Sequence, residues 1–317
     1  MRPDPRDHKA TDAQGLVLWA GTVRRASLQE RVRAASDLGY DAFSFSPDDY
    51  RRARRDGVSD HEIRALIADA GLHVNCLDPY TRWLPTWEPP RDAVPRMLSF
   101  IGADEREFFA AAEAVGARSM TVFEPFGHRW PLDVLAERLA QVCIRARSSG
   151  MRVNVEFIPF LGIPDLATAW QIVQLSADPE AGIVMDTWHY FRGRPDNELL
   201  GSIPGERIGA VQVSDALPDP VGSLETDCLH HRLPVGLGSF PLDGVLSTLQ
   251  QTGGLHDVGP EIFSDAFDKQ QTETNATNAL VGMAPWRALR DTQATGETPA
   301  SRRGAPATST FPNSHQT

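Results

Sequence analysis

Eight times between about residue 16 and residue 283, the chain alternates a short apolar run with a stretch patterned like an amphipathic helix. The runs are mostly continuous and rich in β-branched residues, which is typical of parallel strands buried on both faces. An open doubly wound sheet usually stops at about five or six strands, whereas eight strand–helix units close on themselves. The sequence therefore predicts an α/β fold of the (β/α)8 TIM barrel type. Its strands are expected at residues 16–23, 41–46, 72–78, 118–124, 151–157, 182–187, 207–215 and 257–263.

The helices between these strands are marked by their first and last residues. Ser59 followed by Glu62 has the spacing of a capping box, and Gly71 ends the same helix. Pro131 and Gly150 bound another helix in the same way, since proline favours the first turn and glycine the end. Helices are expected at residues 27–39, 59–71, 103–115, 131–150, 165–177, 196–202, 241–253 and 270–288.

The length of 317 residues, 41% of them hydrophobic, suits one large core. A barrel of this type needs roughly 250 residues. We therefore expect a single domain at 16–288, preceded by a polar extension at 1–15. The tail, residues 289–317, is rich in Ser, Thr, Pro and Ala, and its lack of large apolar residues predicts disorder.

The net charge of −11 argues against nucleic acid and anionic membranes as partners. No run approaches the ~20 apolar residues of a membrane span, and the first residues lack the apolar segment of a signal peptide. Three widely spaced cysteines, Cys76, Cys143 and Cys228, suit a reducing compartment. We expect a soluble, cytoplasmic protein whose partner is a small molecule; whether it forms a homo-oligomer stays open.

Polar residues at the carboxyl ends of barrel strands converge on one mouth, where the chemistry of such barrels takes place. Crowded carboxylates repel one another unless a cation neutralises them, which indicates a divalent metal. All the candidate ligands offer hard oxygen atoms, the preference of Mn²⁺ and Mg²⁺ more than of Zn²⁺. Asp78 and Glu124 end earlier strands and are expected to support the site without binding the metal. The predicted ligands end strands five to eight: Glu156, Asp186, Gln212 and Glu261.

Five short motifs at strand ends resemble the xylose isomerase-like barrel superfamily, because they occur in that family's order and positions. The similarity is clearest from residue 151 to residue 264 and extends over roughly 16–285. It is greatest to the sugar phosphate isomerase/epimerase branch, which includes inosose isomerases and dehydratases, ketose 3-epimerases and 3-dehydroshikimate dehydratases. The motifs are VNVEF (153–157), VMDTWHYF (184–191), VQVSD (211–215), HRLPVGLGSFPL (231–242) and PEIFS (260–264).

The resemblance implies the same four metal ligands and adds substrate-binding residues. The family's histidine three residues beyond the aspartate corresponds to His189, and its arginine after strand seven corresponds to Arg232. Trp188 is a further candidate, since its ring suits the floor of a sugar site, although a core position stays open.

The implied reaction removes a proton next to a carbonyl, with the metal as a Lewis acid that stabilises an enediolate. Glu156 and Glu261 would act as general base and acid, and His189 as the acid for a departing hydroxyl. Returning the proton gives an isomerase or epimerase of a sugar, keto-sugar or cyclic polyol. Losing a β-hydroxyl gives a dehydratase acting on a 3-dehydroshikimate- or inosose-like substrate. Gln212 favours this alternative, because many members have histidine there whereas dehydroshikimate dehydratase-like members carry glutamine.

Two alternatives from other classes remain. A DNA repair endonuclease of the same superfamily needs many histidines, and this chain has few near its predicted site. A non-catalytic barrel that binds a small molecule is the second alternative.

Two departures from the family pattern affect the predicted site. Residues 233–238 lack the acidic residue usual in that loop. Pro260 directly precedes Glu261, and proline removes a donor from a strand ladder, so a bend that displaces Glu261 is a hypothesis to examine.

We predict that ending the chain at residue 288 leaves the melting temperature nearly unchanged, because the tail has few apolar side chains to bury. Thermal denaturation of the full and shortened chains checks this. A fall of many degrees in the shortened chain would show that the tail packs against the barrel or a subunit neighbour.

Overall fold

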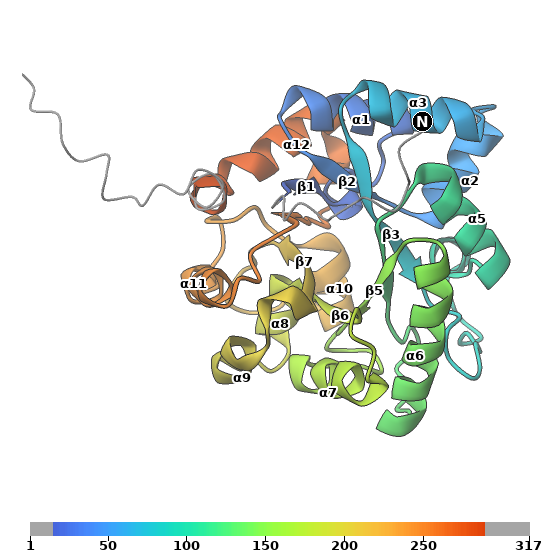
Figure 1. Ribbon diagram of the computed structural model, residues 1–317. Coiled ribbons are helices and arrows are strands. Elements are labelled where there is room, and N and C mark those ends of the chain that lie inside the picture. Colours follow the sequence, from blue (N-terminus) through green and yellow to red (C-terminus); the bar gives the residue numbers. More distant parts are fainter. Residues whose placement is uncertain (1–14, 289–317) are drawn as a thin grey trace, which may run out of the picture.

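The computed structural model describes residues 15–288 and contains eight parallel strands that are hydrogen-bonded in chain order (Figure 1). The ends of this sheet meet, because Leu16 forms a parallel bridge with Val258, and the Val258 N–H donates to Gly15 O at 3.0 Å. The predicted TIM barrel is confirmed. The strands are β1 (Val17–Leu18), β2 (Ala42–Phe45), β3 (His73–Tyr80), β4 (Ser119–Val122), β5 (Arg152–Glu156), β6 (Gly182–Asp186), β7 (Ile208–Val213) and β8 (Val258–Pro260).

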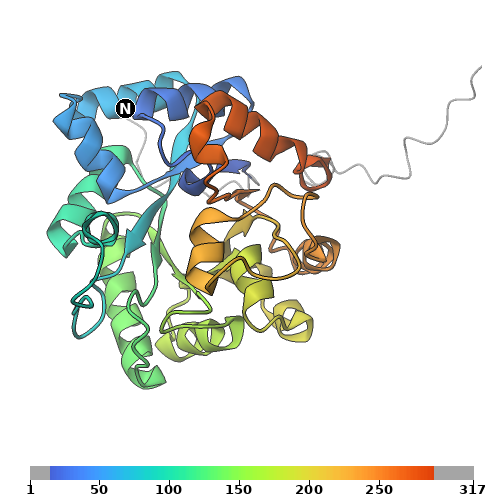
Figure 2. The same ribbon diagram turned by 180° about the vertical axis from the view of Figure 1, so that it is seen from behind.

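Helices surround the strands, as both views show (Figures 1 and 2). Four short helices were not predicted: α2 (Pro47–Arg55), α4 (Pro95–Ile101), α8 (Thr187–Arg192) and α10 (Leu224–His230). The predicted tail and residues 1–14 of the polar extension lie outside the described residues. The helices are α1 (Leu28–Asp37), α2 (Pro47–Arg55), α3 (Asp60–Asp69), α4 (Pro95–Ile101), α5 (Glu105–Val115), α6 (Leu132–Ser148), α7 (Leu166–Ser176), α8 (Thr187–Arg192), α9 (Asn197–Ser202), α10 (Leu224–His230), α11 (Leu242–Thr252) and α12 (Thr272–Val281), with 3₁₀ turns η1 (Ala20–Val23), η2 (Gly205–Arg207) and η3 (Phe267–Lys269).

Three helices near the start of the chain begin with complete capping boxes. The predicted one at Ser59 is present, with Glu62 bonding back to the cap. Ser27 and Ser46 start α1 and α2 in the same way. Each cap satisfies backbone N–H groups that the first turn leaves without partners, so the start of each helix is fixed locally.

Side chains alternate between the two faces of each strand and so divide into two sets. Those that point outward, such as Leu18, Val155 and Val211, join the large core beneath the helices. Those that point inward near the mouth are polar, apart from a small buried cluster across the barrel interior. That cluster consists of Val17, Trp19, Ala42, Cys76 and Ala210.

Pro260 ends β8 without breaking the register of the residue after it. The Glu261 N–H donates to Val213 O at 3.0 Å, as a residue in register with β7 should. N–H groups alternate between the two edges of a strand, so the donor that proline lacks would face β1 and η1. On that edge the Thr22 hydroxyl supplies the hydrogen bonds: it donates to Pro260 O at 2.7 Å and accepts from the Ile262 N–H at 3.0 Å. The backbone of Glu261 therefore keeps its place at the strand end.

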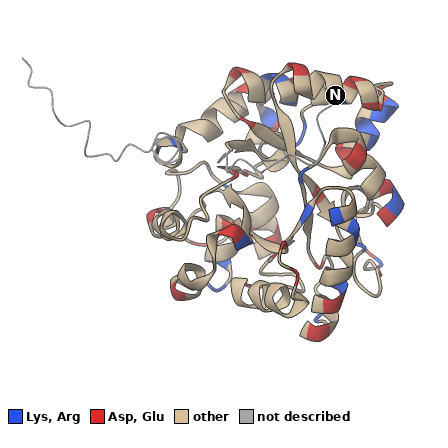
Figure 3. Ribbon diagram, in the orientation of Figure 1, with Lys and Arg blue, Asp and Glu red and all other residues tan. Residues whose placement is uncertain are grey.

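Charged residues of both signs are interspersed along the outer helices, notably α1, α2 and α6 (Figure 3). In residues 15–288, no helix has the length and hydropathy needed to cross a lipid bilayer.

The approach of β8 to β1 gives a stability prediction. A Cβ at Gly259 would overlap the Val17 carbonyl oxygen, which is backbone and cannot turn away. Gly259→Ala should therefore lower the free energy of unfolding by about 1–3 kcal/mol or more. The matched control is Gly244→Ala in α11, where a Cβ would meet no atom of residues 15–288 within 4 Å. It should be neutral or stabilise by up to about 1 kcal/mol. Urea denaturation measures both, and equal effects would contradict this closure of the barrel.

Candidate active site at the carboxyl ends of the strands

Asp186 links the end of β6 to the start of α8. Its Oδ1 accepts from the His189 N–H at 3.0 Å, so the carboxylate caps the helix. The cap explains the three-residue spacing, because the first turn of α8 returns the His189 side chain to the same end of the barrel. His189 Nε2 lies 3.7 Å from Asp186 Oδ2 and 3.4 Å from Glu156 Oε1.

Glu156, Asp186 and His189 form one compact, buried group. One potential ligand atom from each lies within 4.8 Å of the others. Among the residues that the structure describes, this is the group of histidine, cysteine and acidic side chains close enough to share one ion. It contains two of the four predicted metal ligands, together with the predicted substrate-binding histidine.

Arg232 joins this group to Glu261. Its Nη1 donates to Asp186 Oδ2 at 2.7 Å and lies 3.9 Å from Glu261 Oε2, while Nη2 lies 3.4 Å from His189 Nε2. The side chain is only 1% exposed. The guanidinium also contacts the Cys228 sulfur at 3.2 Å and lies over the rings of Trp188 and Phe263.

Backbone pairing directs Arg232 into the barrel. The next residue, Leu233, exchanges two hydrogen bonds of 2.8 Å with Asp215, just beyond β7. On the other side, the Arg232 N–H donates to Phe263 O at 3.1 Å, just beyond β8. The segment after α10 is thus held between two strand ends, which fixes where the arginine side chain emerges.

The charges of this cluster shift its pKa values in opposite directions. Burial raises the pKa of Glu261 well above its usual range; Arg232 opposes the shift, and the charges of Asp186, Glu156 and Asp78 add to it. Burial also acts to raise the pKa of Asp186, but the Arg232 and His189 charges outweigh it and leave that pKa lowered. One guanidinium therefore stabilises Asp186 as an anion and does not fully compensate its acidic neighbours.

Gln212 lies on β7 directly beside Asp186 on β6, in register with it. The side chain is 1% exposed, and neither its oxygen nor its nitrogen has a hydrogen-bond partner in the described part of the chain. A buried amide without partners costs free energy, so these atoms indicate a missing ligand. Together with the uncompensated carboxylates, an available amide oxygen fits a hard divalent cation. Such a cation would share Asp186 and Glu261 with Arg232.

Trp188 lies beneath Arg232 and not at an open surface on which a sugar ring could stack. It is fully buried, its indole N–H donates to Asp227 Oδ2 at 3.1 Å, and its ring packs with Ala216 and Cys228. Asp227 also binds Arg192 Nε at 2.9 Å. The geometry therefore favours Trp188 as a support beneath Arg232.

The two earlier strand-end acids differ from each other. Glu124 Oε2 accepts N–H groups from Phe126, Gly127 and Gly162 at 2.6–3.1 Å, so it braces two loops. Asp78 Oδ1 is buried and has no partner within residues 15–288. Burial, followed by the charge of Glu156, raises the pKa of Asp78 well above its usual value.

Asp215 holds the loop that lacks the family's acidic residue. Its carboxylate accepts the N–H groups of Gly236, Gly238 and Phe240 at 3.0–3.1 Å. This role of Asp215 was not predicted from the sequence. The feature that could have indicated it is the alternating glycines of the loop, since a Cβ at Gly238 would overlap Asp215 Oδ1.

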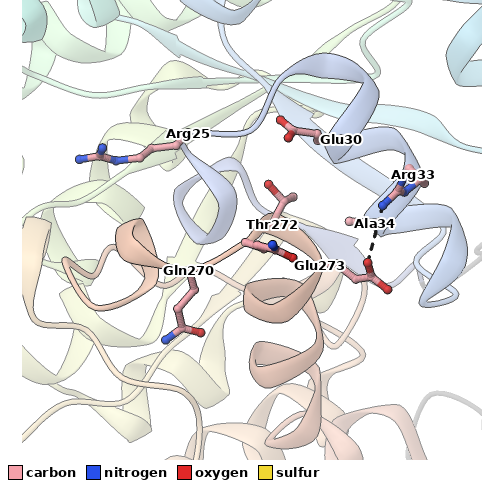
Figure 4. A pocket seen from close by; sticks show the side chains of 8 residues that line it. Arg25, Glu30, Arg33, Ala34, Gln270, Thr272 and Glu273 are labelled. Carbon is pink, nitrogen blue, oxygen red and sulfur yellow. Dashed lines mark ion pairs between the residues drawn. The ribbon is translucent and has the colours of Figure 1, made fainter.

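A separate pocket of about 340 Å³ lies on the outside of the barrel, between α1 and the start of α12 (Figure 4). Its charged residues pair with neighbours: Arg33 with Glu273 at 3.7 Å, and Arg25 with Asp268 at 3.1 Å. It contains none of the site residues predicted from the sequence.

The fold and the strand-end cluster define a (β/α)8 barrel with an acidic centre at the carboxyl ends of its strands. Residues 32–283 match the model of the xylose isomerase-like TIM barrel family, and the chain belongs to that family. The predicted resemblance is confirmed.

Curated relatives carry dehydratase and isomerase names. A 3-dehydroshikimate dehydratase from Pseudomonas aeruginosa is 27% identical over 259 residues, which cover 80% of this chain and 39% of the relative. An inosose isomerase from Bacillus subtilis is 27% identical over 144 residues, covering 45% of this chain and 49% of that protein. The chain thus spans half or less of the length of these relatives.

Solved structures support the same fold. The IolI protein with a bound zinc atom superposes with a TM-score of 0.73 at 17% identity, covering 86% of this chain and 97% of that one. L-ribulose 3-epimerase gives a TM-score of 0.63 at 16% identity, with coverage of 92% and 99%.

We predict that Arg232→Met destabilises the chelated, metal-free protein by about 3–5 kcal/mol, because it leaves buried carboxylates without their cation. Added Mn²⁺ should restore more stability to this variant than to the wild type, since a divalent cation compensates the same carboxylates. Thermal and urea denaturation with and without Mn²⁺ measure both effects.

The matched control is Arg25→Met, whose side chain is 62% exposed and pairs with Asp268. It should change stability by no more than about 1 kcal/mol. If Arg232→Met behaved like this control, the guanidinium would not be what stabilises Asp186.

Proposed function

We propose that this protein is a divalent-metal-dependent enzyme that removes a proton next to a carbonyl of a sugar, keto-sugar or cyclic keto-polyol. Return of that proton makes it an isomerase or epimerase. The observation that carries the proposal is the compact group of Glu156, Asp186 and His189, which Arg232 joins to Glu261. The enzymatic names of the relatives support it.

The residues that would hold the cation are Glu156, Asp186, Gln212 and Glu261. Their donor atoms come from four consecutive strand ends and are all oxygen, which favours Mn²⁺ or Mg²⁺. When bound, the cation supplies positive charge where negative charge develops on the substrate oxygen. Arg232 lies beside the same carboxylates and is suited to hold a substrate oxygen through its fixed N–H groups.

Glu156 and Glu261 are proposed as the proton-transfer pair. A general base needs to ionise, whereas a general acid needs to keep its proton near the working pH. Burial raises the pKa of Glu261 in the metal-free protein, and we assign the role of acid to this carboxyl. Glu156 is then the base, with His189 Nε2 3.4 Å from its Oε1 to orient the carboxylate.

Dehydration is the second candidate, and the match to a 3-dehydroshikimate dehydratase over 80% of the chain favours it. Loss of a β-hydroxyl needs a proton donor near the leaving oxygen. His189 is placed for this role, because its Nδ1 has no partner among the described residues and its Nε2 lies beside Glu156. Both reactions share the first proton abstraction.

A screen of ketoses, inososes and 3-dehydroshikimate in deuterated solvent with Mn²⁺ tests the proposal. The expected result is deuterium at the carbon next to the carbonyl, with an isomer, an epimer or a dehydrated product identifying the outcome. Parallel incubations with Mg²⁺ and Zn²⁺ identify the preferred ion. A protein that takes up no divalent ion and exchanges no substrate hydrogen would instead be a non-catalytic binding barrel.

Glu156→Gln and Asp186→Asn should fail in different ways. Glu156→Gln keeps an oxygen ligand but removes the base, so turnover should fall at least ~10²-fold while a share of metal binding remains. Asp186→Asn weakens a ligand that has no proposed proton role, so excess Mn²⁺ should partly rescue it. Metal content and turnover against Mn²⁺ concentration measure the contrast. Equal rescue of both variants would rule out Glu156 as the base.

A further inference from the structure

The inner faces of the odd-numbered strands place four side chains at one level of the barrel. In a TIM barrel the strands shift by one residue per strand, and alternate strands supply the side chains of one interior layer. When this shift is applied to the observed register, the four side chains at one level are those of Trp19 after β1, Asp78 on β3, Glu156 on β5 and Gln212 on β7. Two of these are proposed metal ligands, whereas Trp19 and Asp78 have no role in the proposed chemistry.

Trp19 brings a hydrogen-bond donor into this layer. Its ring is fully buried and packs with Cys76 and Ala210, which lie one inward position below Asp78 and Gln212 on their strands. The ring therefore forms part of the floor beneath the acidic centre. Within residues 15–288, its indole N–H has no acceptor. A buried donor without an acceptor is rare in folded proteins unless a ligand or water supplies one.

Asp78 brings an acceptor into the same layer. Its carboxyl is adjacent to Glu156 in the odd-strand order, and the charges of the two groups interact. The charge of Asp78 also reaches Glu261. The Thr121 hydroxyl is a partner of the carboxyl, and yet Oδ1 remains without one in the described chain. Asp78 is not one of the proposed metal ligands, so its free oxygen is available to another ligand.

We propose that Trp19 and Asp78 bind a hydroxyl group of the substrate at the ends of β1 and β3. This inference rests on the proposed function and extends it. A hydroxyl donates one hydrogen bond and accepts others, so it suits an indole N–H, which only donates, together with a carboxyl oxygen, which accepts. The chemical class recognised is a keto-polyol with a hydroxyl away from its reacting carbonyl.

Three variants of the Mn²⁺-loaded full-length enzyme test this subsite. The probe is whichever of the ketoses, inososes and 3-dehydroshikimate exchanges hydrogen with solvent in the wild type. Asp78→Asn should raise KM about 10-fold or more, and Trp19→Phe, which keeps a ring but removes the N–H, about 3- to 10-fold. Because the hydroxyl is bound in ground state and transition state alike, kcat should change less than KM. Metal content and melting temperature should stay near the wild-type values.

Glu124→Gln is the matched control, since it alters the acid at the end of the neighbouring strand, whose Oε2 is occupied by three backbone N–H groups. It should lower the melting temperature and leave KM unchanged. Wild-type KM in both Asp78→Asn and Trp19→Phe would overturn this subsite while the proposed function stands. A wild-type protein that exchanges hydrogen in none of the ketoses, inososes and 3-dehydroshikimate would instead overturn the proposed function. Trp19→Phe is the more conservative change and carries the test if Asp78→Asn does not fold.

Discussion

The ion pair between Arg232 and Asp186 is the interaction on which the strand-end cluster depends. Removing an aspartate and an arginine from water costs several kcal/mol each, and close contact with further hydrogen bonds offsets that cost. Here the contact is 2.7 Å, and the His189 N–H completes the shell of Asp186. Without the guanidinium, β6 would end in a buried carboxylate with one partner.

A supporting layer keeps the guanidinium in place. The guanidinium lies over the rings of Trp188 and Phe263, and it donates to both the carbonyl oxygen and the sulfur of Cys228. Trp188 is in turn fixed by Asp227. These contacts come from the segments that follow β6, β7 and β8, so the three loops meet around Arg232.

The strands could be predicted from the sequence because their signal is local. Runs such as residues 151–157 and 182–187 are apolar on the outward face, and each carries an acid near its carboxyl end. This pattern identifies the strand and the end of it that lies at the mouth of the barrel. The spacing from Asp186 to His189 is also local, since one helical turn brings them together. The family resemblance supplied Arg232, whose contacts depend on loops far apart in the chain.

Other features depend on tertiary contacts and were not predicted. The role of Asp215 needs the loop at 233–238 to fold back onto β7. The sequence leaves open whether Trp188 lies in the core or beneath a sugar, because a buried tryptophan and a substrate-facing one have the same sequence pattern. A bend at Pro260 was a hypothesis from the sequence, because proline disrupts strand ladders. Only the tertiary position of Thr22 shows that the N–H absent from Pro260 would face an edge where the Thr22 hydroxyl bonds to Pro260 O and to the Ile262 N–H.

The distribution of charge within the barrel suggests how one scaffold separates chemistry from specificity. The ends of β5, β6 and β8 carry the acids that Arg232 and a cation would compensate, and the proposed proton abstraction next to a carbonyl needs only these. The ends of β1 and β3 carry Trp19 and Asp78, which the common chemistry does not require. In the proposed subsite, a hydroxyl held there would fix which carbon lies above Glu156 and which oxygen lies near His189. A departing hydroxyl and a migrating proton start from the same abstraction, so we propose that the orientation set by the first half of the barrel selects between them.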